Sequence, residues 1–304
     1  MRFALDTLRA VREALGPDRT LGIRISADEY LDGGLTLADM EVVVRRLAEA
    51  VQVDFVNVSH SAYHGSYTVS TQMADMAFSL EQFQPLTRRI RAALAGLARP
   101  PAVLTVCRYR SVAEAEAMLA EDGADMVGMA RAHIADPEIV AKARDGREAE
   151  TTPCIGCNQG CANMLALSLA ITCLANPRAG REAEWPAPAL TRPGRAQRVL
   201  VIGGGPAGME AAATAAGRGH EVALWERDDR LGGGLLWLDR MPLRRDFGAL
   251  LARQAARLAE TGVAVETGRE ATAESVAAWG ADAVVWATGA APEADVLPDG
   301  HAAL

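Results

Sequence analysis

The stretch RVLVIGGGPAG, residues 198–208, joins a short apolar run to a glycine-rich turn. The apolar residues predict a buried strand, and the alanine-rich run Met209–Arg218 predicts the helix that follows it. Gly203, Gly205 and Gly208 form a G-x-G-x-x-G pattern between the two. Gly203 allows the tight turn, Gly205 lets a pyrophosphate approach the backbone, and Gly208 lets helix and strand pack closely. The stretch therefore predicts a dinucleotide-binding fold in the last third of the chain.

An acidic residue and a second glycine cluster extend this pattern. The predicted strand Glu221–Trp225 ends in Glu226, which lies 18 positions after Gly208 and can accept hydrogen bonds from ribose hydroxyls. Leu231-Gly-Gly233-Gly follows, and a later predicted strand ends in Ala-Thr-Gly289. Both features resemble the FAD domain of flavoproteins that bind two dinucleotides. FAD is therefore favoured over NAD at this site, with Gly233 among its contacts.

Four of the five cysteines fall in one pattern upstream of this fold. The segment TPCIGCNQGC, residues 152–161, gives C-x2-C-x3-C, and a fourth cysteine follows after eleven residues in CLANP. Four thiolates that converge can hold an iron–sulfur cluster or a structural zinc ion. A zinc ribbon usually has two separated C-x2-C pairs, so the close spacing favours a [4Fe–4S] cluster. The expected ligands are Cys154, Cys157, Cys161 and Cys173.

The remaining residues between the cysteines and the dinucleotide fold suggest a connection. The prolines at positions 186, 188 and 193 predict a linker. A length of 304 residues suggests about two domains. We therefore expect a first domain over residues 1–150, a cysteine segment with its linker over 151–194, and a dinucleotide-binding domain over 195–304.

The first 150 residues alternate between strand and helix patterns. Apolar strands separated by helices imply a parallel sheet of the α/β class with both faces covered. Chemistry in such sheets lies at the carboxyl ends of the strands. The expected strands are 21–26, 53–59, 102–107 and 126–130, and the expected helices are 3–15, 37–50, 80–97, 111–121 and 137–144.

Polar residues cluster at those strand ends. Arg24 lies inside an apolar strand, where an unpaired charge is costly, so a bound anionic cofactor is at least as good an explanation as a core salt bridge. His64 lies in a long polar loop over residues 59–75 and is a candidate for catalysis, whereas His60 is better explained as structural. Cys107 is expected to be a small buried apolar residue.

The last two strands of the first domain suggest a phosphate site. Arg108 follows the third strand, and Arg131 follows the fourth, beside Met129 and Ala130. Backbone N–H groups after adjacent final strands, aided by arginine, commonly hold a phosphate in eight-stranded barrels.

Composition limits the classes of partner. The net charge is −8 and no basic stripe is present, which argues against nucleic acid. No apolar run approaches the roughly 20 residues needed to cross a bilayer. Without a signal-peptide pattern the expected compartment is the cytoplasm, where reduced cysteines favour metal ligation over disulfides.

Three motifs together carry a family resemblance: the cysteine pattern of residues 154–177, DMVGMAR over 125–131, and GGGPAG over 203–208. With them the chain resembles the iron–sulfur branch of the old yellow enzyme-like NADH:flavin oxidoreductases. That branch includes 2,4-dienoyl-CoA reductase, trimethylamine and dimethylamine dehydrogenases, and N-methylproline or dimethylglycine demethylases. The resemblance implies the C-terminal half of a TIM (β/α)8 barrel, then an iron–sulfur segment, then the start of a Rossmann-like FAD domain.

The resemblance also implies roles for the candidate residues. Arg24 would contact the FMN ring near N1 and O2, and His64 would occupy the place of an active-site histidine. The four cysteines would ligate a [4Fe–4S] cluster next to FMN. The FMN phosphate would be held by Arg108, Met129, Ala130 and Arg131.

Two reactions fit this cofactor set. In the reductive version, NAD(P)H would reduce FAD, single electrons would cross the cluster to FMN, and an activated C=C bond would accept hydride and a proton. In the oxidative version, FMN would take hydride from an N-methyl amine. The loop over residues 64–73 resembles the demethylases more than the dienoyl-CoA reductases, which favours the amine for substrate.

The number of strand–helix units indicates that the barrel is incomplete. An eight-stranded barrel typically takes ~250 residues, and four strand–helix units precede the cysteines here. We therefore expect a fragment, completed by a homo-oligomer or by a chain that supplies the missing half-barrel. The alternative to an enzyme acting on a small-molecule substrate is a catalytically incomplete electron-transfer fragment without a functional FMN site.

Overall fold

The computed structural model describes residues 1–185 and 194–290, which belong to two compact units, Met1–Gly180 and Arg181–Leu304. Each unit has its own parallel sheet and its own core. The three prolines expected to form a linker, at positions 186, 188 and 193, lie outside the described residues. Within the described ranges, no helix is long and apolar enough to cross a membrane.

The first unit contains a parallel sheet in the order β1-β2-β3-β4, as the alternating pattern predicts. Its register aligns Ile25 with Val58, and Val58 with Thr105. The strands are β1 (Gly22–Ser26), β2 (Phe55–Ser59), β3 (Ala102–Thr105) and β4 (Met126–Val127).

Helices connect these strands, and the residues at their N-termini explain where several of them begin. Thr36 and Ser111 cap their helices with reciprocal side-chain and backbone hydrogen bonds. The expected helix over 80–97 instead begins at Gln84, because Pro85 fits the first turn and not the interior. The elements are α1 (Arg2–Leu15), α2 (Leu37–Ala50), α3 (Ser66–Gln72), η1 (Leu80–Gln82), α4 (Gln84–Leu94), α5 (Val112–Ala120), α6 (Ala130–Ala135), α7 (Ile139–Arg144), η2 (Glu148–Glu150) and α8 (Ala162–Ala166).

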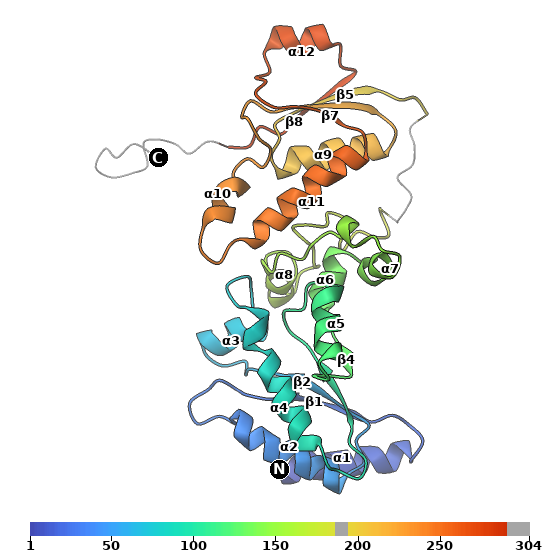
Figure 1. Ribbon diagram of the computed structural model, residues 1–304, viewed down its shortest axis with the longest axis vertical. Helices are drawn as coiled ribbons and strands as arrows, with labels where there is room; N and C mark the ends of the chain where they lie inside the picture. Colours follow the sequence, from blue (N-terminus) through green and yellow to red (C-terminus); the bar gives the residue numbers. More distant parts are fainter. Residues whose placement is uncertain (186–193, 291–304) are drawn as a thin grey trace, which may run out of the picture. The chain divides into compact units, whose positions relative to one another are not determined.

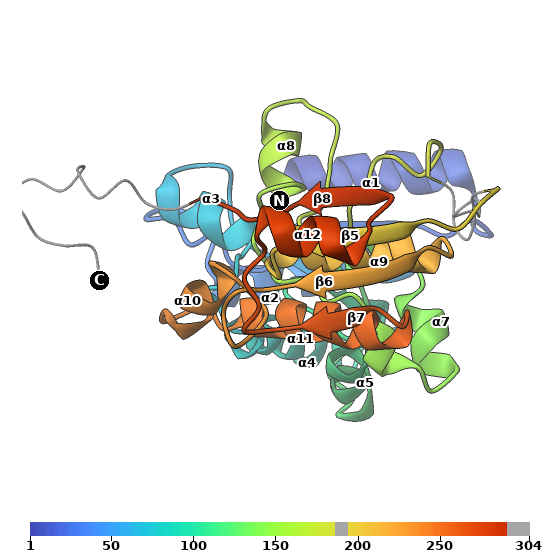
Figure 2. The ribbon, with the colours of Figure 1, turned by 90° about the horizontal axis from the view of Figure 1, so that it is seen from above.

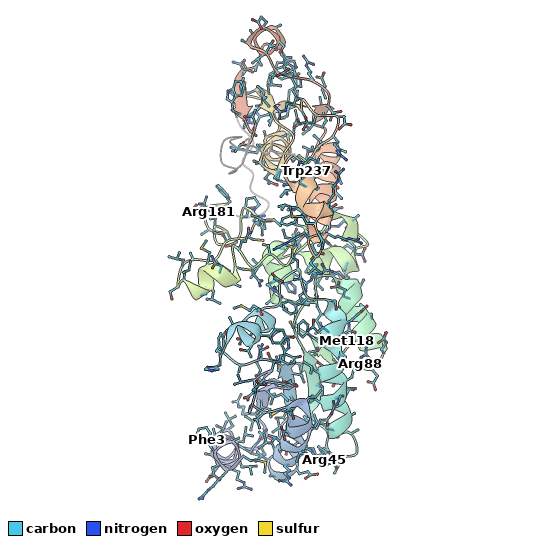
Figure 3. The ribbon with its side chains drawn as sticks, turned by 90° about the vertical axis from the view of Figure 1, so that its left-hand side faces the viewer. Phe3, Arg45, Arg88, Met118, Arg181 and Trp237 are labelled. Atoms are coloured by element: carbon cyan, nitrogen blue, oxygen red, sulfur yellow. The ribbon has the colours of Figure 1, made fainter. Side chains whose placement is uncertain are left out.

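The core of the first unit lies on one face of its sheet. Val56 and Val58 of β2 pack against α2 and α4, which lie next to each other in Figure 1. A second cluster, centred on Met118 of α5, includes residues of α6 and α7 (Figure 3). Alternate residues point to the opposite face, where Met126 is 59% exposed. The expectation that both faces are covered is therefore wrong for the described residues.

Arg24 lies on that opposite face and is exposed, so it is not a buried charge inside an apolar strand. Its guanidinium Nη2 donates to Ser59 Oγ at 3.0 Å. Strand alternation directs this side chain away from the helix-covered core, so the cost of burying a charge does not apply to it. At the outer edge of the unit, Phe3 of α1 is 85% exposed (Figure 3).

Two further expected elements differ from the structure. The polar loop over residues 59–75 contains the helix α3, whose Thr68 and Thr71 are buried. Polar residues with no apolar period give no helical signal, and the helix is held by side-chain contacts of these threonines. The strand expected over 126–130 ends at Val127, and Ala130 begins α6.

The second unit contains a parallel sheet in the order β7-β6-β5-β8, and its strands lie side by side in Figure 2, which looks onto the face of the sheet. Helices cover both faces, with α9 and α11 on one side and α12 on the other (Figure 1). This layering fits the expected Rossmann-like fold. The elements are β5 (Arg198–Ile202), α9 (Pro206–Gly217), β6 (Glu221–Trp225), α10 (Leu235–Arg240), α11 (Asp246–Glu260), β7 (Ala264–Glu266), α12 (Ala273–Trp279) and β8 (Ala283–Trp286).

Candidate functional site

Four cysteine side chains from two separated segments line one cavity of the first unit. Arg131 and Ile134 of α6 also line it. All five cysteines lie in the described part of the chain, and none of them forms a disulfide. The cysteines around the cavity are Cys154, Cys157, Cys161 and Cys173, the four expected metal ligands.

Backbone N–H groups approach two of these sulfurs. Burial raises the pKa of the Cys154 thiol, and the Gly156 N–H group and the charge of Arg131 act in the opposite direction. Burial likewise raises the pKa of Cys173, against hydrogen bonds from the N–H groups of Ala175 and Asn176. N–H donors of this kind favour the thiolate over the thiol. The thiolate is the form that binds metal.

No three His, Cys, Asp or Glu side chains in the described ranges lie close enough together to hold a single metal ion. The cysteines therefore surround a space and do not meet at one point. A zinc ion would require sulfur atoms about 2.3 Å from the metal.

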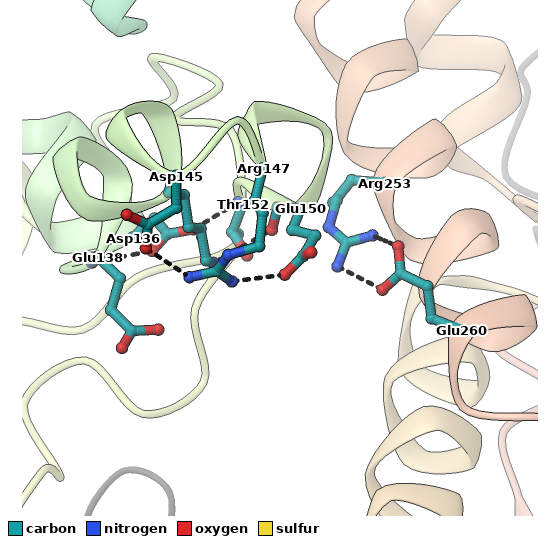
Figure 4. Close-up of polar contacts among 9 residues, drawn as sticks. Asp136, Glu138, Asp145, Arg147, Glu150, Thr152, Arg253 and Glu260 are labelled. Atoms are coloured by element: carbon teal, nitrogen blue, oxygen red, sulfur yellow. Dashed lines mark hydrogen bonds and ion pairs between the residues drawn. The ribbon is translucent and has the colours of Figure 1, made fainter.

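The short helix α6 holds the cysteine segment at three places. Its Arg131 donates through Nη1 to Asn158 Oδ1 at 2.6 Å. The carbonyl oxygen of Ile134 accepts from Asn176 Nδ2 at 2.9 Å. Asp136, at the end of the helix, accepts from the Thr152 N–H group at 2.8 Å (Figure 4). The sequence alone indicates no role for these asparagines or for Asp136, because their partners are distant along the chain.

Arg108 lies against the same segment. Its side chain is buried, and Nε donates to the Phe78 carbonyl oxygen at 2.9 Å. Gly156 has φ of +63°, and a Cβ atom on it would lie 2.3 Å from Arg108 Nη1. Only glycine fits this position, since it tolerates both the backbone conformation and the close guanidinium.

The three arginines expected to bind FMN all affect the pKa of one thiol. The charges of Arg131, Arg108 and Arg24 all oppose the burial that raises the pKa of Cys107. Cys107 is half-buried and packs against the core of the first unit, so it is less enclosed than expected. The charges of these three arginines thus all reach Cys107, which follows β3.

An amide in the same sheet has a buried acceptor. Asn57 of β2 is aligned with Arg24 of β1. Its Oδ1 atom is buried and has no hydrogen-bond partner among the described residues. A buried acceptor of this kind usually binds a donor from water or a ligand.

The two histidines of the β2–α3 connection differ in environment. His60 is buried, its Nε2 lies 2.9 Å from the Thr71 carbonyl oxygen, and its ring stacks on Phe83. Burial lowers the pKa of His60. His64 is exposed, two residues before α3, and its backbone N–H group donates to Thr68 Oγ1. His60 thus has the contacts of a structural residue, and the His64 ring is accessible.

Met129 and Ala130 stand at the start of α6. Met129 is 9% exposed and belongs to the cluster around Met118. Ala130 is the first helical residue. Their expected contribution to a phosphate site would come from backbone N–H groups, since the first N–H groups of a helix have no acceptor within it.

The second unit places its glycines in a tight strand–turn–helix connection. A Cβ atom on Gly208 would lie 1.8 Å from the Gly203 carbonyl oxygen, so helix and turn pack too closely for a side chain. A Cβ atom on Gly205 would meet nothing within 4 Å, which leaves space beside the start of α9. Gly233, with φ of +51°, lies against Gly205.

Glu226 closes this turn from the end of β6. Its buried carboxylate accepts from the Gly204 N–H group at 2.6 Å and from the Asp228 N–H group at 2.9 Å. The structure thus brings together the glycines and the acid that the sequence singles out. This arrangement can bind a dinucleotide at a helix N-terminus.

Comparison with known proteins gives two family matches. Residues 1–150 match the NADH:flavin oxidoreductase / NADH oxidase family. Residues 198–247 match the family of FAD dependent oxidoreductases.

Individual relatives span both units. The chain is 37% identical over 293 residues to an NADH oxidase of Thermoanaerobacter brockii, which covers 96% of this chain and 43% of the relative. It is 32% identical over 301 residues to a probable N-methylproline demethylase of Rhizobium meliloti. This match covers 99% of this chain and 43% of the relative. A solved 2-naphthoyl-CoA reductase superposes with a TM-score of 0.85 at 28% identity, over 96% of this chain and 43% of that one. The chain therefore spans less than half the length of these relatives.

Proposed function

Because this chain belongs, through residues 1–150, to the NADH:flavin oxidoreductase / NADH oxidase family, we propose that it carries the electron path of a flavin- and [4Fe–4S]-dependent oxidoreductase. The observation that carries the proposal is the placement of four cysteines around one cavity, which Arg131 and Ile134 of α6 also line. When bound, FAD and FMN supply two-electron chemistry and the cluster relays single electrons between them.

The cysteine cavity fits a cluster better than a single ion. Its four thiols line a shared space, yet no three of them converge closely enough for one metal. A multi-iron cluster is larger than one ion, so its ligands stand farther apart. N–H groups directed at Cys154 and Cys173 would stabilise the ligating thiolates.

The first unit also fits the anionic FMN. The charges of Arg24, Arg108 and Arg131 all act at Cys107, and cations favour both a phosphate and a reduced, anionic flavin ring. The buried acceptor of Asn57 would accept from an N–H donor of a ligand on the same face. Arg24, Arg108, Met129, Ala130 and Arg131 would hold FMN.

The second unit fits FAD at its glycine turn. Gly203 and Gly208 shape the turn, Gly205 leaves room for the pyrophosphate, and Glu226 is fixed to accept from ribose hydroxyls. NAD(P)H would supply the electrons to this flavin.

His64 would hold the proton that the reaction moves. Its exposed ring would donate to a substrate being reduced at a C=C bond, or orient an N-methyl amine being oxidised. The relatives include a reductase and a demethylase by name, and both substrate classes fit the same residues. Replacing His64 with alanine should lower substrate turnover and spare the cofactor content.

The content of iron, FAD and FMN after anaerobic purification tests the proposal. We expect about four irons per chain, one FAD and one FMN, and loss of the iron in Cys173→Ser. A chain without iron would contradict the electron path.

One observation favours the alternative, an electron-transfer piece without a complete active site. The face of the sheet that carries Arg24 lacks a covering layer in the described residues, and Met126 on it is 59% exposed. A flavin on this face would therefore lack a wall unless another half-barrel supplied it. Iron and FAD without FMN would favour an electron-transfer piece with no complete active site.

A further inference from the structure

Asn158 connects the cysteine loop to a distant part of the first unit. It lies between Cys157 and Cys161 and has φ of +59°, a conformation that asparagine tolerates better than most residues. Its Oδ1 atom accepts from Arg131 Nη1 at 2.6 Å, and its Nδ2 donates to the Met73 carbonyl oxygen. The amide is thus used as acceptor and donor at once.

Arg131 completes the connection. The same Nη1 atom that bonds to Asn158 also donates to the Ala74 carbonyl oxygen at 2.8 Å. Met73 and Ala74 are adjacent, so the two side chains and this short stretch of backbone form a closed ring of hydrogen bonds. Ala74 is fully buried, and the Met76 nitrogen lies 3.3 Å from the position of a Cβ atom on Gly156.

The bonded backbone is the exit of the segment that carries His64. That segment runs from Ser61 through α3, and Met73 is the residue that ends the helix. At its other end, the Ser61 N–H group donates to the Asp28 carbonyl oxygen at 2.7 Å, and the Ser61 carbonyl oxygen accepts from Ser26 Oγ at 2.9 Å. The segment is therefore held at both ends, and the cysteine loop with Arg131 holds its exit.

We propose that Asn158 is a positioning residue that couples the cysteine loop to residues 61–76, so that binding of a cluster orders the segment carrying His64. The inference rests on the proposed function, since it takes the cysteines as cluster ligands. Four sulfur–iron bonds would restrict the loop that holds Asn158, and a restricted loop holds Met73 at a lower entropic cost. Thermodynamic linkage makes the effect reciprocal, so an ordered segment would favour the cluster.

Hydrogen exchange of residues 61–76 measures this coupling directly. The full chain is compared after anaerobic reconstitution with iron and inorganic sulfide, and again after removal of the iron with a chelator. In the wild-type chain we expect exchange to be about two- to tenfold slower with the cluster, the change expected for one or two net hydrogen bonds. Asn158→Ala should remove the difference between the two states while the cysteines still take up iron.

Two further variants separate coupling from simple stability. Asn158→Asp keeps the acceptor for Arg131 and loses the donor to Met73, so its cluster dependence should be smaller than in the wild-type chain. Gln159→Ala changes an exposed amide next to Asn158 and should keep the full dependence. A merely structural role for Asn158 would speed exchange in both states by one factor and leave their ratio unchanged.

Two outcomes separate a failure of the coupling from a failure of the proposed function. Iron uptake with an unchanged ratio in Asn158→Ala would overturn the coupling and leave the proposed function in place. A wild-type chain that takes up no iron would overturn the proposed function, and the coupling with it.

Discussion

Lys142 Nζ lies 2.6 Å from Asp136 Oδ2, and both side chains are largely buried, at 13% and 4% exposure. Lys142 is the single lysine of the chain and also donates to the Glu150 carbonyl oxygen at 3.2 Å. The same carboxylate oxygen of Asp136 accepts from the Thr152 N–H group, two residues before the first metal-binding cysteine of the proposal (Figure 4). The ion pair therefore fixes the entry of the cysteine segment.

Replacing Lys142 with methionine should destabilise the first unit by about 3–5 kcal/mol, because Asp136 is left as a buried charge without its partner. Urea unfolding followed by circular dichroism at pH 7 measures the loss. Arg144→Met is the matched control on the same helix, since its pair with Asp145 is exposed and should contribute about 0–1 kcal/mol. Equal losses in the two variants would mean that the buried pair has no special role.

The contact between Gly156 and Arg108 gives a second prediction. Gly156→Ala should cost about 1–2 kcal/mol for the left-handed backbone and a further ~1–3 kcal/mol for displacing the guanidinium. Gly146→Ala has a similar φ of +69° but open space around its Cβ atom, so it should show the first cost alone. Unfolding free energies of both variants, with iron content after reconstitution, check the difference. Equal destabilisation would contradict the close contact.

Much of the fold is visible in the sequence, because local signals decide it. The helix over Leu37–Ala50 has the expected bounds, since Thr36 and Asp39 form a capping box before an apolar period. The strands β5 and β6 also begin and end where the apolar runs do. In these elements, propensity, capping and hydrophobic pattern agree, which makes the prediction simple.

The parts that the sequence did not reveal depend on contacts between distant residues. The bond from Asn158 to Met73 joins residues 85 positions apart, and the one from Asn176 to Ile134 joins residues 42 apart. No local period or spacing encodes such pairs. Both asparagines belong to the cysteine motif. Their side-chain amides find partners only in the folded chain, where α6 supplies Arg131 and the Ile134 carbonyl oxygen.

The buried His60 should make stability depend on pH. Burial lowers its pKa below the ordinary value of about 6.5, and the nearby Arg24 acts in the same direction, while the hydrogen bond to Thr71 and the charge of Asp28 act against it. As pH falls below about 6.5, the unfolded chain binds a proton that the native state does not, so the free energy of unfolding decreases. The decrease levels off once pH is below the lowered pKa, because both states are then protonated.

Urea unfolding at pH values between 7.5 and 5 tests this dependence. The wild-type chain should lose stability more steeply than His60→Leu, by at most about 1.4 kcal/mol per pH unit. Subtracting the two curves removes the contribution of all other titrating groups. Parallel curves would show that His60 does not titrate between the two states in this range.

Replacing one carboxylate oxygen of Glu226 with an NH₂ group should weaken the binding of FAD. Its two carboxylate oxygens accept from the N–H groups of Gly204 and Asp228, so a glutamine would place an NH₂ donor against one of these donors. An unsatisfied buried donor costs about 1–3 kcal/mol, which predicts FAD affinity weakened by about tenfold in Glu226→Gln. Titration of FAD fluorescence measures the dissociation constant. Glu221→Gln makes the same charge change at the exposed start of β6 and should bind FAD like the wild-type chain. If both variants lost affinity equally, net charge rather than the geometry of the turn would control binding.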